Sequence, residues 1–323
     1  MVELIKTKRY KSATDFLVDI SFAGEMYQNL KDDFVFRGHQ SGSYKLVPSV
    51  LRHKIQMKDA AGNVVEDDKD APFNIAESEF IQKNLEYYQL RQFFDICDKN
   101  GLRLPTVDRI RNTLYSHKDI LSFFLDGGDW LPNDLHELAA LAQHYGMETR
   151  LLDWTTSFET AIYFAINKEP DLTKEEKLEK DSEYVAIWAL NIPRVYFGIE
   201  SPLRVIRPPY FGNPNLAAQK GLFTFWNVTG LKLPLTTVNK EDNESVFEMF
   251  KRMTNRTPLN ELIEEELKKQ GIEDVVMWKL LIPRKDRKEL YEYIRKRNVN
   301  AASLFPGYEG VARCIKEDKS FGL

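Results

Sequence analysis

The stretch ELAALAQHYGMETRLLDWTTSFETAIYFAIN, residues 137–167, decides how the chain is organised. Apolar residues recur at helical spacing over 135–142, which predicts an amphipathic helix. Gly146 stands where the end of such a helix favours a residue with positive φ. Ser157 is a good N-cap for a second helix, which we expect over 158–167. The segment between the two helices forms a polar elbow, and a binding site can be built at such a place.

The elbow carries a dense group of polar and aromatic side chains. They are His144, Tyr145, Arg150, Asp153, Trp154, Thr155 and Thr156. Hydroxyls and unpaired N–H groups converge where a helix begins, and they can hold a phosphate or a ribose. Plain helix capping, which needs only Ser157, is the simpler interpretation. Trp154 is open to two interpretations as well, stacking on a ligand ring or burial in the core beside two leucines.

His144 falls at the expected helix end, where the helix dipole favours its cationic form. It is a candidate general base or a hydrogen-bonding partner for a ligand, and the alternative is a structural histidine with its bonds satisfied. No His-x-x-x-His or Glu-x-x-His pairing is present in the sequence. The sequence therefore predicts no metal site.

Length and composition exclude several classes of protein. The 323 residues allow one large domain or two ordinary ones, and a net charge of −4 excludes a polycation that binds nucleic acid with its whole surface. No stretch reaches the roughly 18 apolar residues of a membrane span, and no apolar run follows the N-terminus. We therefore expect a cytoplasmic protein with no membrane partner. Cys97 and Cys314 are expected to be reduced thiols.

Helical patterns dominate the first half of the chain and strand patterns the second, which predicts an α+β fold. Strands are expected at 33–37, 184–190, 203–207, 222–226 and 275–282. A Walker loop, a dinucleotide-binding Gly-x-Gly-x-x-Gly and a nucleophile elbow are absent from the sequence. Their absence argues against a P-loop NTPase, a Rossmann dehydrogenase and an α/β-hydrolase.

Four segments together resemble the FRG domain, a bacterial family named after a Phe-Arg-Gly tripeptide. They are Phe36-Arg37-Gly38, QHYGMETRLLDWTTSFETAIYFA (143–165), NPNLAAQKGLFTF (213–225) and SLFPGYEGVA (303–312). They follow one another in the order typical of the family. The resemblance extends from about residue 33 to 315.

The order of these segments is similar to that of ADP-ribosyltransferases, which bind NAD through an early Arg or His on a strand. The resemblance therefore implies one domain over 1–323, with a split, bent sheet that cradles NAD. It also implies a largely helical insertion over 53–130 within the N-terminal part. A role as a bacterial toxin or phage-defence effector is implied by this resemblance alone, with an antitoxin or regulatory protein among the expected partners.

Arg37 is the first candidate for binding NAD. An arginine at a strand end can hold a phosphate through two hydrogen bonds, and Gly38 leaves room for the ligand to approach. The alternative is a structural ion pair with a carboxylate such as Asp153. The resemblance favours ligand binding, because it aligns Arg37 with the residue that anchors NAD.

The resemblance also implies a Glu or Gln that stabilises positive charge on the ribose as nicotinamide leaves. Glu309 and Gln219 are the candidates, and Glu309 comes first because a carboxylate suits this chemistry better. The sequence departs from the transferase pattern here, since it has no clean Glu-x-Glu or Gln-x-Glu on an expected strand. Glu309 is alternatively a solvated residue at a helix start. A non-catalytic nucleotide-sensing or interaction module is therefore the rival function.

The acceptor of ADP-ribose is expected to be RNA or DNA rather than protein, because 284–297 predicts a basic helix. Leu290, Tyr291, Tyr293 and Ile294 interleave there with Lys and Arg. Such a helix can contact the phosphates of a nucleic acid. The alternative is an amphipathic surface helix with a charged outer face.

Overall fold

The computed structural model describes residues 3–30, 33–58, 64–65, 74–112, 129–195, 201–211, 213–228 and 251–323. The chain divides into two compact units. Unit 1 consists of Met1–Leu46, Leu152–Thr224 and Pro258–Leu323. Unit 2 consists of Val47–Leu151 and Phe225–Thr257.

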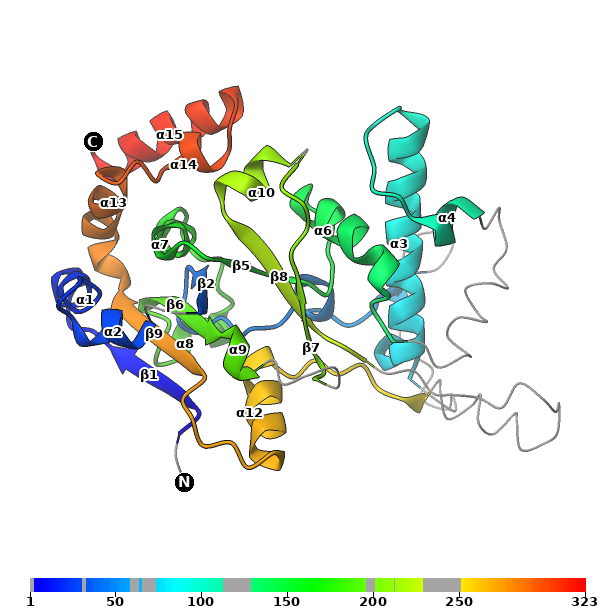
Figure 1. Cartoon of the computed structure of the whole chain (residues 1–323), viewed down its shortest axis with the longest axis horizontal. Helices are drawn as coiled ribbons and strands as arrows, with labels where there is room; N and C mark the ends of the chain where they lie inside the picture. Colours follow the sequence, from blue (N-terminus) through cyan, green and yellow to red (C-terminus); the bar gives the residue numbers. More distant parts are fainter. Residues whose placement is uncertain are drawn as a thin grey trace. The chain divides into compact units, whose positions relative to one another are not determined.

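Unit 1 is built on one seven-stranded mixed sheet with the strand order β1-β9-β6-β2-β5-β8-β7 (Figure 1). The strands are β1 (Ile5–Arg9), β2 (Phe34–His39), β5 (Leu152–Thr155), β6 (Tyr184–Asn191), β7 (Leu203–Ile206), β8 (Gly221–Trp226) and β9 (Met277–Pro283). β1 and β9 run parallel, whereas β6 pairs antiparallel with both β9 and β2. β5 pairs antiparallel with β2 and β8.

All five predicted strands are present within one or two residues of their expected bounds, so the prediction of a mixed α and β chain is confirmed. β1 was not predicted. Its sequence, IKTKR, contains one strongly apolar residue, and the strand is partly exposed along its length. It is a strand because its backbone pairs with β9, and a hydrophobic pattern cannot reveal such a pairing.

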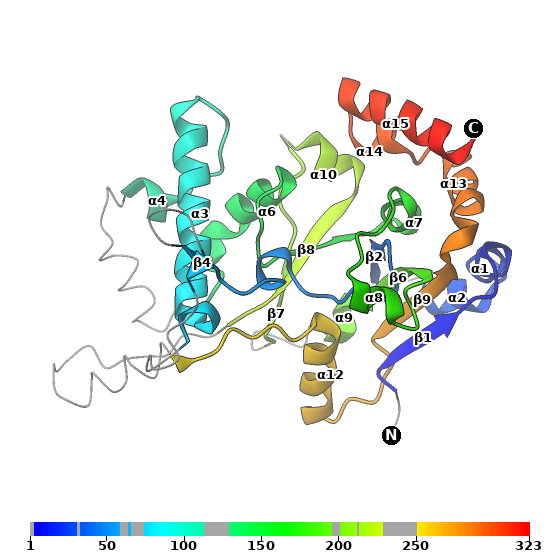
Figure 2. The same ribbon diagram turned by 180° about the vertical axis from the view of Figure 1, so that it is seen from behind.

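Helices cover the sheet of unit 1, and α7 packs directly on β2 and β6. They are α1 (Ala13–Asp19), α2 (Glu25–Leu30), α7 (Phe158–Ile166), α8 (Lys174–Leu178), α9 (Ile192–Val195), α10 (Pro214–Ala218), α12 (Leu259–Lys269), α13 (Arg287–Arg295), α14 (Ala301–Leu304) and α15 (Tyr308–Phe321). A 3-10 turn, Arg284–Asp286, precedes α13. α13 contacts α7 in turn, as both views show (Figure 2). The main hydrophobic core lies where these helices meet the sheet, around Phe16, Ile162, Ile187, Leu280 and Tyr291.

Unit 2 is mainly helical in the part that the structure describes. Its elements are α3 (Glu79–Lys99), α4 (Asp108–Asn112), α6 (His136–His144), the strand pair β3 (Met57–Lys58) and β4 (Val64–Val65), and short 3-10 turns at Ser49–Leu51, Ile75–Glu77 and Asn133–Leu135. α3 packs against α6. The helical insertion expected over 53–130 stays a prediction, and 59–63, 66–73 and 113–128 within it lie outside the described residues.

The two helices of the organising stretch form as predicted. α6 ends at His144, and Gly146 has a φ of +92°. The Ser157 side chain accepts a hydrogen bond from the main-chain N–H of Thr160 and caps α7. The two helices belong to different units, α6 to unit 2 and α7 to unit 1, so the elbow spans the boundary between the units.

Candidate functional site

β2 presents Arg37 on the sheet face opposite α7. Successive side chains of a strand point to opposite faces, so Phe36 and Arg37 are separated. The Phe36 ring packs edge-on against Phe158 of α7, with ring centres 4.9 Å apart. Arg37 therefore faces away from the hydrophobic core, together with His39.

Gly38 has a different role from the one expected. A Cβ at this position would lie 2.0 Å from the main-chain oxygen of Ala161 and 2.6 Å from the main-chain nitrogen of Ala165. Both atoms belong to α7. The space that Gly38 leaves open is thus filled by the α7 backbone, and its predicted use as an approach for a ligand needs this correction.

The Arg37 guanidinium is fixed by three hydrogen bonds. Nη1 donates to the main-chain oxygen of Asp153 (2.8 Å) and to its carboxylate Oδ2 (3.3 Å), and Nε donates to Nε2 of His39 (2.9 Å). The His39 ring must then carry its proton on Nδ1, which donates to the main-chain oxygen of Tyr44 (3.3 Å). The ion pair with Asp153, which was the structural alternative, is thus formed. The Asp153 side chain is 62% exposed and that of Arg37 is 14% exposed.

A cleft of ≈ 460 Å³ lies in unit 1, and Arg37 is linked to it through its strand neighbours without lining it. Its cross-strand partner on β6 is Trp188, whose own partner on β9 is Lys279, so the three side chains form a row on one sheet face. Trp188 and Lys279 line the cleft, as does Tyr44, to which His39 is bonded. The Lys279 ammonium lies 5.4 Å from the centre of the Trp188 ring.

The cleft contains a carboxylate held between two cations. Asp181 Oδ1 accepts a hydrogen bond from Arg9 Nη2 (2.9 Å), and Oδ2 accepts one from Lys279 Nζ (3.2 Å). Burial opposes ionisation of Asp181, but the bonds from Arg9 and Lys279 outweigh it and hold its pKa below the ordinary value. The other residues lining the cleft are Gly42, Ser43, Lys45, Glu179, Lys180, Pro258, Asn260 and Glu261.

The indole nitrogen of Trp188 is buried. Its side chain is 5% exposed, and its indole N–H has no hydrogen-bond partner among the residues that the structure describes. A buried N–H without a partner costs free energy, because its hydrogen bond to water is lost on folding.

In the elbow, the hydroxyl of Thr155 makes hydrogen bonds to main-chain groups of neighbouring segments. The hydroxyl of Thr155 donates to the main-chain oxygen of Gln219 (2.7 Å) and accepts from the N–H of Ser157 (3.0 Å). Thr156 is exposed, and its N–H donates to the main-chain oxygen of Lys220. Trp154 is buried and donates through its indole N–H to Thr224 (2.8 Å), so the core interpretation of Trp154 is the one that the structure supports.

Neither candidate catalytic residue lines the cleft. Gln219 follows α10, and its side-chain amide donates to the main-chain oxygen of Leu304 (3.1 Å). Glu309 is exposed in the first turn of α15. This position matches the alternative of a solvated residue at a helix start.

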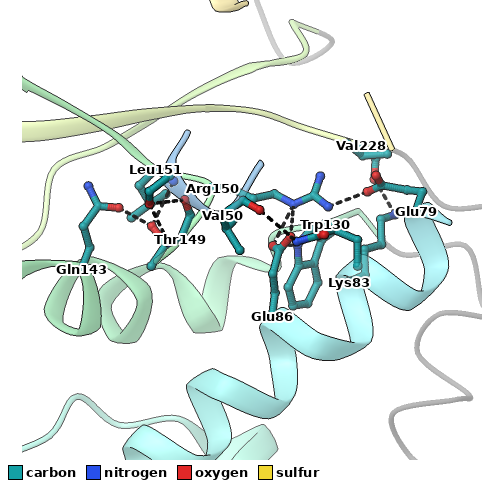
Figure 3. A network of polar contacts seen from close by, with 12 residues as sticks. Val50, Glu79, Lys83, Glu86, Trp130, Gln143, Thr149, Arg150, Leu151 and Val228 are labelled. Atoms are coloured by element: carbon teal, nitrogen blue, oxygen red, sulfur yellow. Dashed lines mark hydrogen bonds and ion pairs between the residues drawn. The ribbon is translucent and has the colours of Figure 1, made fainter. Parts of the chain in front are cut away.

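His144, Tyr145 and Arg150 belong to unit 2. His144 and Tyr145 lie at the end of α6 with ring centres 5.2 Å apart, and Tyr145 is exposed. Arg150 lies between two carboxylates of α3, as Figure 3 shows. Its Nη2 donates to Glu79 (2.7 Å) and its Nε to both oxygens of Glu86 (2.9 and 2.8 Å). All three side chains are buried, which makes this a structural charge network.

Trp130 and Lys83 complete the network of Figure 3. The indole N–H of Trp130 donates to Glu86 (2.7 Å), and the Lys83 ammonium donates to the main-chain oxygen of Val228 (3.3 Å). Burial lowers the pKa of Lys83 to about 8, since removal from water disfavours the charged form. Glu79, Lys83 and Glu86 occur at helical spacing, and this signal could have shown that one face of the helix is charged.

The basic helix is amphipathic. In α13 the side chains of Leu290, Tyr291 and Ile294 are fully buried, so they are not available to a nucleic acid. Arg295 pairs with Asp318 (2.7 Å), and Arg287 pairs with Glu169 (2.6 Å). The structure thus supports the amphipathic alternative.

Comparison with known proteins finds one family model that matches part of the chain. The model of the FRG domain matches residues 32–174, a range that contains β2, α3, α6, β5 and α7. The resemblance is confirmed over this range, and the later segments at 213–225 and 303–312 lie outside it. No curated protein and no solved structure matches the chain.

Within the described ranges, no group of three or more His, Cys, Asp or Glu is placed to hold a metal ion. None of the helices in that part of the chain has the length and apolar character needed to cross a bilayer.

Proposed function

We propose that the chain is an NAD-dependent ADP-ribosyltransferase whose NAD lies on the Arg37 face of the unit 1 sheet. The observation that carries the proposal is that the Arg37 guanidinium is fixed on the sheet face whose next residues in the row, Trp188 and Lys279, line a cleft of ≈ 460 Å³. A guanidinium held in place loses little entropy on binding, and a phosphate that replaces the exposed Asp153 carboxylate could accept hydrogen bonds from two of its N–H groups. The size of the cleft is within the range of small-molecule sites, which is roughly 300–1,000 Å³.

The composition of the cleft supports a dinucleotide ligand. Tyr44 supplies aromatic surface for a ring, and Arg9 and Lys279 supply positive charge for phosphates. In the proposed reaction the bond between nicotinamide and ribose breaks, nicotinamide leaves with the bonding electrons, and an acceptor nucleophile bonds to the ribose carbon. The acceptor is proposed to be RNA or DNA in preference to protein. A role in a toxin or phage-defence system remains part of the proposal.

A negative group near the ribose would stabilise the positive charge that develops there. Glu309 and Gln219 remain the proposed catalytic residues. Glu179 and Glu261 join them as candidates because they line the cleft. Sequence reasoning missed both, since each lies in a charged surface segment.

The rival proposal is a non-catalytic nucleotide-sensing module, and the state of Asp181 favours it. The carboxylate held most firmly in the cleft is already neutralised by Arg9 and Lys279. A neutralised carboxylate is less able to stabilise a cationic ribose.

The test is nicotinamide release from NAD by the purified protein, with RNA, DNA and cell lysate supplied in separate reactions. Wild type is expected to release nicotinamide with a nucleic acid, and Arg37→Ala to lose this activity. Among Glu309→Gln, Gln219→Ala, Glu179→Gln and Glu261→Gln, loss of about 10²-fold or more in rate identifies the catalytic group. NAD binding without nicotinamide release in any reaction would support the rival, and absence of NAD binding would overturn both.

A further inference from the structure

We propose that Arg9 and Lys279 form a binding subsite for the phosphates of a nucleotide, and that Asp181 occupies this subsite until such a ligand displaces it. The assignment of this subsite to NAD rests on the proposed function. The subsite itself would serve equally well for a nucleotide that is bound and not converted.

The two cations are held by neighbouring strands. Arg9 ends β1, and Lys279 lies within β9. The strands are parallel, with Thr7 opposite Lys279, so Arg9 follows Thr7 by two residues and points to the same face. Both side chains line the cleft. The sheet therefore fixes the spacing of the two cations.

Asp181 bonds the two cations as one anionic group of a ligand would. Each of its carboxylate oxygens takes one cation, Oδ1 with Arg9 and Oδ2 with Lys279. Two oxygens of a phosphate can make the same pair of contacts, and they bring more negative charge. An incoming phosphate would thus replace the bonds of Asp181 and would not leave either cation unpaired.

Displacement of Asp181 does not require the main chain to move. Its main-chain oxygen accepts from the N–H of Tyr184 (3.1 Å), and the main-chain oxygen of Tyr184 accepts from the N–H of Gly42 (2.8 Å). These bonds hold the turn before β6, and none of them involves a side-chain atom of Asp181.

The wall next to the cations suits the base or sugar of a nucleotide. Lys279 lies over the Trp188 ring, so the aromatic surface adjoins the positive charge directly. Tyr44, which is half-buried at the same cleft, adds a second aromatic ring. These features together indicate a nucleotide rather than an inorganic anion alone.

The experiment is calorimetric titration of the full chain with ADP, with inorganic pyrophosphate and with adenosine. Asp181→Asn keeps the shape of the side chain and removes its charge, so it is expected to bind ADP and pyrophosphate at least about tenfold more tightly, a gain of about 1.4 kcal/mol. Arg9→Gln and Lys279→Met are each expected to weaken the binding of ADP at least about tenfold. Lys6→Gln is the matched control, since Lys6 is a cation of the same strand as Arg9 and does not line the cleft. Its affinity for ADP should change by about twofold or less.

Each variant is compared with wild type by thermal unfolding, and Asp181→Asn provides a gain of affinity that misfolding cannot produce. Unchanged or weaker ADP binding in Asp181→Asn would overturn the inference. The inference would also be overturned if Arg9→Gln and Lys279→Met both bound ADP with the affinity of wild type. Tighter ADP binding in Asp181→Asn without nicotinamide release from NAD would overturn the transferase proposal and leave the phosphate subsite standing.

Discussion

Arg37 donates a hydrogen bond to the main-chain oxygen of Asp153 at 2.8 Å, although 116 residues separate the two in the sequence. The contact joins β2 to β5, which are already paired through Phe36 and Thr155. The same guanidinium bonds His39, which in turn bonds the main-chain oxygen of Tyr44 at the cleft. Arg37 thus ties β2 to β5, and the binding role proposed for it can be separated from this structural role by experiment.

Substitution of Arg37 is expected to affect binding more than stability. Arg37→Ala should lower the free energy of unfolding by about 1–3 kcal/mol, because charge-assisted hydrogen bonds to Asp153 and His39 are lost. NAD binding should be abolished, and Arg37→Lys should not restore it, because a single ammonium cannot make two parallel bonds. Denaturant unfolding and NAD titration provide the two measurements.

Asp153→Asn is the control for Arg37. It keeps the main-chain acceptor and removes a carboxylate that is 62% exposed, so the loss of stability should stay below about 1 kcal/mol. Equal NAD affinity in wild type and Arg37→Ala would show that Arg37 is structural only.

Gly38→Ala is expected to destabilise unit 1 because the new methyl group meets the α7 backbone. The closest atom would be the Ala161 oxygen at 2.0 Å, and neither the strand nor the helix can move away without loss of packing. The expected loss is about 3 kcal/mol or more, measured by denaturant unfolding. Gly271→Ala is the control, since it has a φ of +69° and open space around its Cβ, and should cost only about 1–2 kcal/mol. A fully stable Gly38→Ala protein would contradict the packing shown for β2 and α7.

Arg150→Met is expected to be among the most destabilising changes in unit 2. It leaves the carboxylates of Glu79 and Glu86 buried without their cation, and such a loss typically costs about 3–5 kcal/mol. Adding Glu79→Gln and Glu86→Gln should recover part of this loss, because the buried charges are removed as well. Comparison of the single and triple variants by thermal unfolding checks the prediction. A triple variant less stable than Arg150→Met would show that the network does not act as one charge cluster.

Because of Lys83, the free energy of unfolding is expected to vary with pH in the alkaline range. Its pKa is about 8 in the folded chain against an ordinary 10.5, so the unfolded chain binds more protons between these values. The stabilising contribution of neutral Lys83 is therefore complete above about pH 10.5 and is lost as the pH falls to about 8. The difference amounts to about 3 kcal/mol.

Lys83→Met tests this dependence. The variant should be more stable than wild type at pH 7, and its advantage should shrink between pH 8 and 10.5. Unfolding curves at a series of pH values measure the difference. A difference between the two proteins that does not change with pH would mean that Lys83 stays charged when buried.

The sequence by itself determined the local elements of this protein. The cap at Ser157, the positive φ at Gly146 and the alternation of Phe36 and Arg37 all depend on residues close together in the chain. Such features follow from backbone sterics and from short-range hydrogen bonds, so they can be predicted from neighbouring residues alone. The family resemblance over 32–174 is a property of the sequence as well.

The tertiary structure alone decided which side chains meet. Four residues that meet at the cleft come from separate parts of the chain: Arg9 from β1, Asp181 from the turn before β6, Trp188 from β6 and Lys279 from β9. No spacing in the sequence links them. Their meeting depends on the register and order of the strands, which are set by long-range pairing. Arg150 is an elbow residue in the sequence, but in the structure it is part of a buried charge network with α3. The reason is the same, because burial and hydrogen-bond partners are properties of the packed chain. Neighbouring residues of one elbow can therefore belong to different units.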